Sequence, residues 1–313
     1  MDNFTDETMD TIIQILSHKL QELEDDKILE FSVLDPDSSL NSYAGQKVTI
    51  NNNTYIYRSY KSWCDLAELI GGRILTPKVK DKNLIVIRYK KLNTSSSFHK
   101  SDLSKEEKYG TDSQFAVINK NEEPSFLYYY KQALKNVNID KRKRVLNLGI
   151  NTGDEFETII NSIADISDHH LTGIDYSPSA IKRAKERFKQ FENIEFYTHD
   201  INELDTLKLE SFDLIVTIGT LQSTSLEFKP LFMKLVQENL KKDGSLIVGF
   251  PNCRWIDTQM VYGAVPPNYN FSEMSILYKD VQFCKKYLQQ KKFRVTISGK
   301  DYIFLTATSI KKS

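Results

Sequence analysis

The chain is poor in cysteine and tryptophan, and it has no excess of charge of either sign. Among its 313 residues there are three Cys and two Trp, and 42 basic residues balance 42 acidic ones. The cysteines, Cys64, Cys253 and Cys284, form no CxxC pair, so a disulfide framework is excluded and a reducing compartment is indicated. The balanced charge excludes a strong overall field that would steer nucleic acid or acidic membranes.

Long apolar runs are also missing. No stretch approaches the roughly 20 apolar residues that a membrane-spanning helix needs, and the acidic start, residues 1–7, lacks the apolar core of a secretory signal. We therefore expect a cytoplasmic protein. The five histidines show no metal-ligand spacing, so no metal is expected. An apolar fraction of 40% and an aromatic fraction of 11% are typical of a globular protein with a sizeable core.

Residues 1–100 predict a small α+β module behind a leading helix, with a role in substrate recognition. The helix is expected over residues 5–26 with Thr5 as N-cap, and its apolar stripe either packs on its own module or pairs two subunits of a homo-oligomer. That stripe consists of Met9, Ile12, Ile13, Leu16, Leu20 and Leu23. Further along, the pattern predicts strands at 48–50, 55–57 and 84–89, a hairpin turn at 51–53, a short helix at 62–70 and a polar linker at 92–113.

Residues 101–313 predict a second domain in which strands alternate with helices. After a helix at 124–136, strands are expected at 144–148, 171–175, 194–198, 213–218 and 245–250, with helices at 154–165, 178–191, 228–241 and 279–291. Two final strands, from Phe293 and from Tyr302, form an antiparallel hairpin. The fold class is therefore α/β, with a doubly wound, mostly parallel seven-stranded sheet that ends in this hairpin.

One stretch carries most of the chemistry. Val145–Gly153 reads as a buried strand that ends in a glycine-bearing turn and opens into a helix, and Asp175 ends the next strand about twenty residues later. The glycines let a ligand approach the backbone, the helix start favours a carboxylate, and Asp175 can accept from two ribose hydroxyls. Asp200, after the third strand, can accept from an exocyclic amine. The pattern predicts an adenosine-containing cofactor.

These motifs resemble those of the class I, Rossmann-like S-adenosylmethionine-dependent methyltransferases over about residues 110–313. Five stretches agree in order and spacing: Val145–Gly153, Thr172–Ala180, Phe196–Asp200, Phe212–Val216 and Leu240–Val248. A nucleotide-linked dehydrogenase is the alternative, although its last strands would be parallel. The resemblance implies S-adenosyl-L-methionine as cofactor, and as its binding residues Asn147, Gly149, Asn151, Gly153, Asp175, Tyr176, Asp200, Ile201, Ile218 and Gly219.

Two positions depart from the family pattern. Asn147 stands where the family usually has an acidic residue, which removes a charge near the cofactor's ammonium group. Asn151 stands where a third glycine is frequent, but asparagine tolerates left-handed backbone angles. Asp154 and Glu155 follow directly, and they either supply the missing acidic group or cap the helix.

The sequence indicates the methyl acceptor less clearly than the cofactor, and it assigns no catalytic residue. The Asn/Asp-Pro-Pro-aromatic motif of amino-directed nucleic-acid enzymes is missing after the fourth strand, where residues 219–223 read Gly-Thr-Leu-Gln-Ser. Cys253 lacks the second Pro-Cys that RNA cytosine-C5 enzymes carry, so a buried structural role is expected. A small metabolite or biosynthetic intermediate is favoured as substrate, and the candidate contacts, several of them in a loop expected at 251–274, are Tyr109, Gln222, Asn252, Arg254, Tyr262 and Tyr269.

Two alternatives stay open. The N-terminal module has a basic stretch between Arg73 and Lys100, with Tyr55, Tyr57, Tyr60 and Trp63 close by, and such a surface can hold RNA, including tRNA. An ordinary solvated face gives the same pattern. The second alternative is a non-catalytic S-adenosylmethionine-binding module, which the neutral Asn147 motivates.

Overall fold

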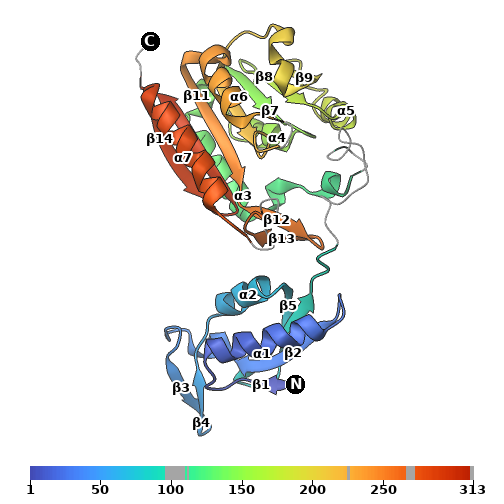
Figure 1. Cartoon of the computed structure of the whole chain (residues 1–313), viewed down its shortest axis with the longest axis vertical. Helices are drawn as coiled ribbons and strands as arrows, with labels where there is room; N and C mark the ends of the chain where they lie inside the picture. Colours follow the sequence, from blue (N-terminus) through green and yellow to red (C-terminus); the bar gives the residue numbers. More distant parts are fainter. Residues whose placement is uncertain (96–109, 111–112, 224–225, 266–271, 311–313) are drawn as a thin grey trace. The chain divides into compact units, whose positions relative to one another are not determined.

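The computed structural model of the protein describes residues 1–95, 110, 113–223, 226–265 and 272–310 (Figure 1). Its internal contacts divide the chain into two compact units. One consists of Met1–Ser97 with Trp255–Val261, and the other of Phe98–Arg254 with Tyr262–Ser313.

The first unit is built on a four-stranded sheet of order β1-β2-β6-β5. Helices α1 (Met9–Glu22) and α2 (Tyr60–Leu69) pack on this sheet, because Ile12, Leu16 and Leu20 of α1 and Trp63 of α2 share one buried cluster with Phe31 and Tyr89. Most of the apolar stripe of α1 therefore packs on its own module, whereas Ile13 is 40% exposed. The strands are β1 (Asp2–Asn3), β2 (Ile28–Leu34), β5 (Gly72–Val79) and β6 (Leu84–Lys91), and a separate hairpin joins β3 (Lys47–Ile50) to β4 (Asn53–Ile56), with a 3-10 turn at η1 (Pro36–Ser39).

Three details of this unit differ from the sequence expectation. Helix α1 begins at Met9 and not near Thr5, because Thr8 is the N-cap and accepts from the Thr11 amide, while the Thr5 carbonyl accepts from Ile56. Strand β2 was not expected. Neither was β5, whose register shifts between Leu75 and Lys78 around a proline. The hairpin turn is confirmed, with positive φ at Asn51 and Asn52.

The second unit contains the predicted seven-stranded sheet, in the order β14-β15-β11-β10-β7-β8-β9. Strands β7 to β11 run parallel, and β15 is antiparallel to both β11 and β14, so the fold class is confirmed. The strands are β7 (Arg144–Leu148), β8 (His170–Asp175), β9 (Ile194–Thr198), β10 (Phe212–Ile218), β11 (Leu240–Pro251), β14 (Phe293–Gly299) and β15 (Tyr302–Ser309).

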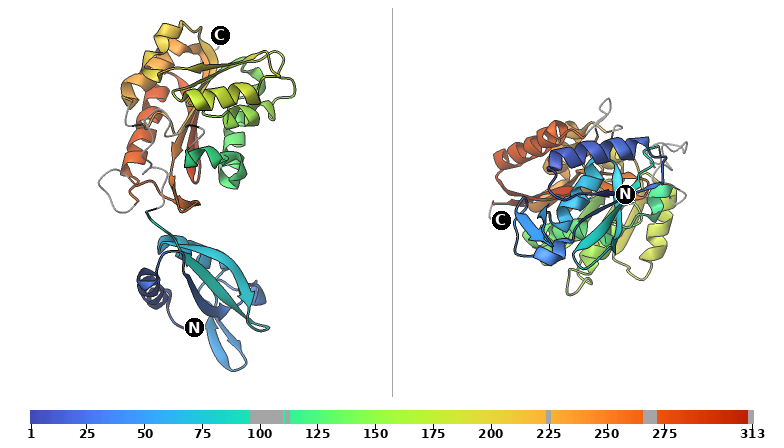
Figure 2. Two further views of the ribbon diagram at one scale, coloured as in Figure 1. Left: turned by 90° about the vertical axis from the view of Figure 1, so that its right-hand side faces the viewer. Right: turned by 90° about the horizontal axis from the view of Figure 1, so that it is seen from below.

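Helices cover both faces of this sheet, as Figures 1 and 2 show. On one face α6 (Phe228–Lys234) and α7 (Ser275–Gln290) bury Phe232 and Leu288 against Leu146 and Leu246. On the other face α3 (Pro124–Asn136), α4 (Asp154–Ile160) and α5 (Pro178–Arg187) pack on Val145 and its neighbours. Alternate residues of one strand thus enter opposite cores, which is why the strands read as continuous apolar runs.

Shorter elements complete this unit. Single 3-10 turns lie at η3 (Gln114–Val117), η4 (Lys120–Glu122), η5 (Ile139–Lys141) and η6 (Ile201–Leu207), and α6 continues into a π-helical turn, η7 (Leu235–Asn239). Helix α4 ends at Ile160, five residues before the expected end. The region expected to be a loop after β11 instead contains a hairpin of β12 (Cys253–Ile256) and β13 (Gln259–Tyr262), most of which, Trp255–Val261, is counted with the first unit.

Candidate cofactor and acceptor site

The glycine turn after β7 is fastened to the end of the neighbouring strand β8. The Gly149 amide donates to the Ile174 carbonyl at 2.8 Å, and the Asn151 amide donates to Asp175 Oδ2 at 2.8 Å. Gly149, Asn151 and Gly153 all have positive φ, of 76°, 48° and 96°. Asn151 therefore adopts the left-handed backbone conformation that asparagine tolerates in place of the glycine frequent at this position.

Asp175 stands at the carboxyl end of β8 with both oxygens engaged by backbone. Oδ2 accepts from Asn151 as above, and Oδ1 accepts from the Ser177 amide at 3.0 Å. Burial raises the pKa of Asp175 above its usual value, and these amide hydrogen bonds oppose the rise. Each carboxylate oxygen has a second lone pair, so the fixed carboxylate can also accept from the two hydroxyls of a ribose.

The close approach of the two central strand ends depends on Gly149. Thr220, which follows β10, donates its hydroxyl to the Leu148 carbonyl at 3.1 Å. A Cβ on Gly149 would lie 1.9 Å from that hydroxyl oxygen. On the other side, the Gly219 amide donates to the Gly249 carbonyl at 2.9 Å. The turns after β7, β10 and β11 therefore form one continuous edge, the usual ligand site of open parallel sheets.

Asn147 is fully enclosed at the end of β7, with 1% of its surface exposed. Its Nδ2 group has no hydrogen-bond partner among the residues that the structure describes. A buried donor without a partner costs about 1–3 kcal/mol, and a hydrogen bond to a ligand oxygen would remove this cost. The fixed Asp175 carboxylate and the unpartnered Asn147 donor fit a cofactor that carries ribose hydroxyls and anionic oxygens.

The residues that follow the third strand, β9, are engaged in contacts within the chain. Asp200 Oδ1 accepts from the Asn202 amide at 2.9 Å and caps the turn η6, and Ile201 is 6% exposed. Tyr176, after β8, is 44% exposed. The His199 amide donates to the Asp175 carbonyl at 2.9 Å, which places this segment beside β8. The adenine contacts of these residues, and of Ile218, stay predictions.

A buried ion pair beside the glycine turn was not expected from the sequence. Lys120 Nζ, from η4, lies 2.8 Å from Glu155 Oε1 of α4, and the two side chains are 12% and 2% exposed. Burial alone would lower the pKa of Lys120, but Glu155, with Asp154 and Asp175 further away, raises it above its usual value. Glu155 is thus a buried acidic group on this face of the sheet, where Asn147 is neutral.

Helix α5 also holds the glycine turn. Arg187 donates to the Thr152 carbonyl at 3.2 Å, and its guanidinium pairs with Asp154 and Glu157 at 2.6 Å each. These carboxylates and Glu155 occupy the first turn of α4, where the sequence predicted a carboxylate of the ligand. A groove of about 460 Å³ opens on this outer side, lined by Ala116, Val117, Ile118, Asn119, Thr152, Asp154, Arg183 and Arg187.

The candidate acceptor residues divide into two kinds. Asn252 donates to the Lys300 carbonyl at 3.2 Å, and Arg254 donates to the carbonyls of Tyr262 and Gly263 at 2.7 and 2.6 Å, so both brace the loops that follow β11. The Tyr262 hydroxyl contacts the Met274 sulfur. Gln222 differs, because both of its amide atoms are buried without a partner among the described residues. Tyr109 and Tyr269 lie outside the described residues.

Cys253 has the environment of a structural residue. It is 8% exposed, and burial raises the pKa of its thiol to about 12. Such a thiol stays protonated at neutral pH and is a poor nucleophile, in agreement with the absence of a cytosine-C5 motif. Among the residues that the structure describes, no three or more His, Cys, Asp or Glu side chains gather to hold a metal ion.

The basic stretch of the N-terminal module is largely paired with acids. Lys78 and Arg88 both contact Glu30, at 2.9 and 3.1 Å, and the hydrogen bond from Lys78 lowers the pKa of Glu30. Lys90 pairs with Asp26 at 2.7 Å. Three of the four nearby aromatic residues, Tyr55, Tyr57 and Trp63, are at most 7% exposed. They belong to the core, so the expectation that they offer a stacking surface is wrong.

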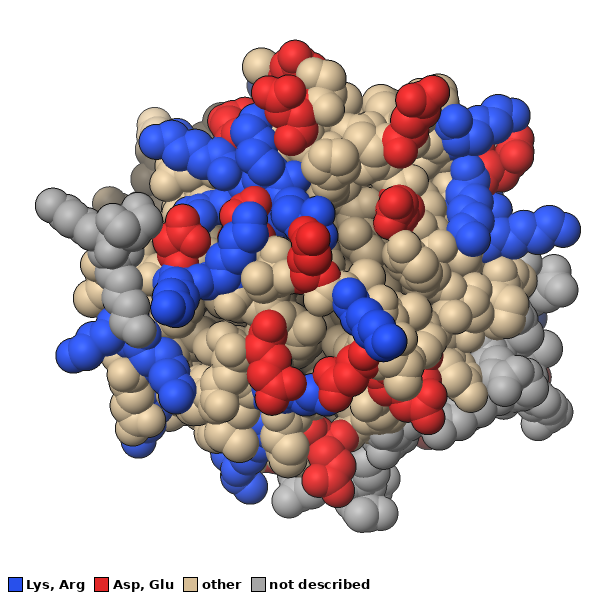
Figure 3. Space-filling view, turned by 90° about the horizontal axis from the view of Figure 1, so that it is seen from above, with Lys and Arg blue, Asp and Glu red and all other residues tan. Residues whose placement is uncertain are grey.

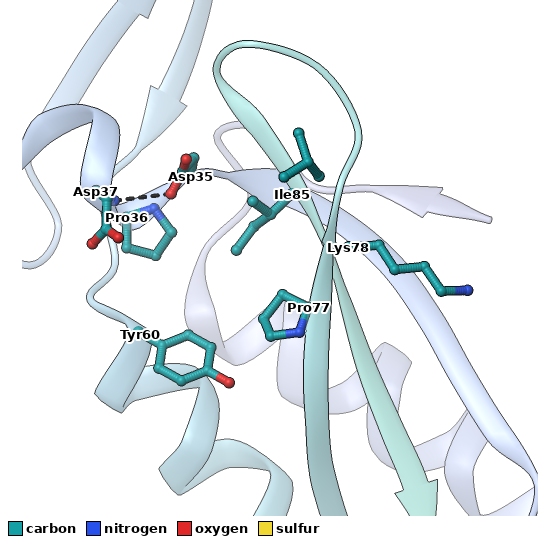
Figure 4. Close-up of a pocket in the computed structure, with 8 residues that line it drawn as sticks. Asp35, Pro36, Asp37, Tyr60, Pro77, Lys78 and Ile85 are labelled. Atoms are coloured by element: carbon teal, nitrogen blue, oxygen red, sulfur yellow. Dashed lines mark hydrogen bonds between the residues drawn. The ribbon is translucent and has the colours of Figure 1, made fainter.

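The module has a surface groove of about 390 Å³, drawn in Figure 4. Tyr60, Pro77 and Ile85 face it, whereas the Lys78 side chain points away. Across the groove, Asp35 Oδ1 accepts from the Asp37 amide at 3.0 Å. This groove has an apolar floor and an acidic side, which does not favour a nucleic-acid backbone.

Charge is mixed on one face of the surface as well. On the face drawn in Figure 3, Lys and Arg side chains alternate with Asp and Glu, in keeping with 42 residues of each sign. Within the described part of the chain, the structure contains no helix with the length and apolar character of a membrane span.

Comparison with known proteins agrees with this geometry. A family model described as a methyltransferase domain matches residues 139–297. The chain is 29% identical over 157 residues to a carboxy-S-adenosyl-L-methionine synthase from Helicobacter pylori strain Shi470, a match over 49% of this chain and 63% of that protein. The chain therefore spans less than two thirds of this curated relative's length.

Solved structures with a similar fold include an S-adenosylmethionine-dependent methyltransferase from Aquifex aeolicus, with a TM-score of 0.45, 16% identity, and coverage of 63% of this chain and 96% of that one. Another is the N-methyltransferase NodS from Bradyrhizobium japonicum WM9 in complex with S-adenosyl-L-homocysteine, with a TM-score of 0.43, 19% identity, and coverage of 64% and 93%. The match of the family model to half of the sequence decides the assignment: this chain belongs to the class I methyltransferase family, whose cofactor is S-adenosyl-L-methionine.

Proposed function

We propose that the protein is a methyltransferase that uses S-adenosyl-L-methionine and acts on a small metabolite or biosynthetic intermediate. The observation that carries the cofactor part is Asp175, whose two oxygens are fixed by the amides of Asn151 and Ser177 at the ligand edge of the sheet. A carboxylate held in this way needs no reorganisation when it accepts from a ribose, which favours binding.

The chain's own residues have distinct roles in this proposal. Asp175 orients the ribose, Asn147 offers an Nδ2 donor that no other described residue uses, and the turn at Gly149 gives close access to the backbone. The bound cofactor supplies an electrophilic methyl group. Transfer by displacement requires that the acceptor be aligned with that methyl group. We assign this orienting role to Gln222, whose amide donor and acceptor have no partner within the described part of the chain.

A small acceptor is favoured over RNA by the N-terminal module. Its aromatic side chains are mostly in the core, and Lys78, Arg88 and Lys90 are paired with acids of the same module. Protein–RNA affinity depends on cations that displace counterions from phosphates, and these side chains are already engaged. We propose instead that the module contributes to the recognition of the small substrate.

Removal of the Asp175 carboxylate tests the cofactor site. Asp175→Ala and the milder Asp175→Asn should weaken S-adenosylhomocysteine binding, by about 100-fold for alanine, because hydrogen bonds to a charged group contribute about 1.5–3 kcal/mol each. Titration calorimetry measures the affinity. Asp168→Ala serves as the matched control, since Asp168 is 80% exposed and its ion pair with Lys143 is long, at 3.9 Å. Equal affinity in Asp175→Ala and the unmodified protein would exclude the proposed site.

A cofactor that carries a trideuterated methyl group serves to identify the methyl acceptor. Mass spectrometry should show the label in the small-molecule fraction of a cell extract and not in bulk tRNA. The same spectra report the cofactor itself, including the carboxy-S-adenosylmethionine that the name of the Helicobacter pylori relative specifies. Label in tRNA would favour the RNA alternative, and binding without any transfer would favour the non-catalytic one.

A further inference from the structure

Lys120 lies beside the glycine turn at the cofactor edge, although no sequence motif marks it. Its turn, η4, precedes the residues 139–297 that the family model matches. From there the ammonium group reaches Glu155 at 2.8 Å, and the side chain is 12% exposed. Glu155 comes two residues after Gly153, so the pair lies directly behind the glycine turn.

The rest of η4 fastens the same region. Asn121 Nδ2 donates to the Asp154 carbonyl at 3.0 Å, and Asn121 Oδ1 accepts from the Thr158 hydroxyl at 3.0 Å. Asn121 Nδ2 also donates to Glu157 Oε2 at 3.2 Å, so two consecutive residues, Lys120 and Asn121, hold α4 by four contacts. The position of the glycine turn therefore depends on a segment more than thirty residues away in sequence.

Lys120 also acts on Asp175. Burial raises the pKa of the Asp175 carboxyl, and the Lys120 ammonium is one of the groups that oppose this rise, after the backbone amides; in return Asp175 contributes to the raised pKa of Lys120. Asn147, the family's usual acidic position, carries no charge. The positive charge of Lys120 consequently favours the ionised form of the carboxylate that accepts from the ribose.

We propose that Lys120 is a positioning residue for cofactor binding: it holds the start of α4 behind the glycine turn and keeps the Asp175 carboxylate ready to accept from the ribose hydroxyls. This inference rests on the proposed function, because it concerns the same cofactor site. It adds a residue from outside the region that carries the family's motifs.

The inference predicts a specific pH dependence. Asp175 must be ionised to accept two hydroxyl hydrogens, so affinity falls as the pH drops through its pKa. The charged and titratable groups around the pair are Lys120 on η4, Asp154 and Glu155 on α4, Asp175 after β8, Tyr130 on α3 and Tyr302 on β15. Loss of Lys120 raises the pKa of Asp175, so the decline in affinity should begin at a higher pH.

The decisive variant is Lys120→Met with Glu155→Gln, because it removes both charges and leaves no buried charge unpaired. Calorimetry with S-adenosylhomocysteine between pH 4.5 and 8 should show a raised acid midpoint of binding. Glu155→Gln alone keeps the Lys120 charge, so its midpoint should not rise. Lys189→Met is the control, since Lys189 on α5 is 69% exposed and pairs with Glu186.

A merely structural ion pair gives a different result. If the double variant keeps the wild-type midpoint, or if Glu155→Gln raises the midpoint as much as the double variant does, Lys120 has no effect on Asp175 and the inference is wrong. A different result would contradict the proposed function: the unmodified protein would then not bind S-adenosylhomocysteine at any pH. Circular dichroism at each pH confirms that the variants are folded.

Discussion

At the scale of single residues, the site depends on positions where a side chain is missing or fixed. Gly149 has a φ of 76°, and a Cβ there would lie 1.9 Å from Thr220 Oγ1 and 2.8 Å from Thr220 Cβ. Thr220 in turn caps the Leu148 carbonyl. The turn therefore excludes alanine for two separate reasons, backbone strain and overlap with Thr220.

Gly149→Ala separates these two effects when it is combined with a change at Thr220. The single variant should lose more than about 2 kcal/mol of stability and most of its cofactor affinity. Gly149→Ala with Thr220→Gly removes the overlap but keeps the strain of the left-handed conformation, about 1–2 kcal/mol. Urea denaturation measures the free energy of unfolding of both variants, with Thr220→Gly alone as the control. Equal destabilisation in the single and double variants would show that the overlap with Thr220 is unimportant.

The sequence predicted some of these residues and not others. Gly149 and Asp175 follow from a local pattern, a strand that ends in a turn, and the structure places both at one edge of the sheet. Lys120 could not be predicted, because its pairing with Glu155 joins positions 35 residues apart and no local period marks it. The free amide of Gln222 is equally invisible in the sequence, since an unpartnered atom is a property of packing.

At the scale of elements, periodicity predicted the buried strands best. Strands β7 to β10 are apolar runs of five to seven residues between turns, and their observed bounds differ by one residue at most from the expected ones. The hairpin of β12 and β13 was expected as a loop, because its turn at Asp257 and Thr258 contains neither asparagine nor glycine. Both residues nevertheless have positive φ, 46° and 62°, as a two-residue hairpin turn requires.

This turn makes a prediction about strain. A β-branched residue such as Thr258 is strongly disfavoured at positive φ, so Thr258→Gly should stabilise the hairpin by about 1 kcal/mol. Amide hydrogen exchange in residues 253–262 should slow by about fivefold, the factor that corresponds to this energy. Asp257→Gly is the comparison, because it also removes the contact of Asp257 with Lys90 at 3.6 Å and should gain less. Faster exchange in Thr258→Gly would contradict the assignment of strain.

At the scale of the whole molecule, charge balance limits the partners. The 42 basic residues equal the 42 acidic ones in number, and the structure pairs them locally, as Lys78 and Arg88 share Glu30. Acids of the same module therefore neutralise a part of the basic run between Arg73 and Lys91. Sequence alone could not show this, because the neutralising acids come from β2 and from the segment before it.

The protein should accordingly bind bulk tRNA only weakly. Non-specific nucleic-acid binding at physiological salt reaches Kd values of about 10⁻⁴–10⁻⁶ M when several free cations contact phosphates, and the module's paired cations predict affinity at or below the weak end of that range. A gel shift in 150 mM salt measures it, with Lys78, Lys80 and Lys82 replaced by Glu in a second protein. Because Lys78 contacts Glu30 and Lys80 contacts Ser32, the replacement should leave the weak tRNA affinity nearly unchanged. A micromolar shift that the triple replacement abolishes would show instead that these ion pairs open to phosphate, and it would make RNA the favoured acceptor.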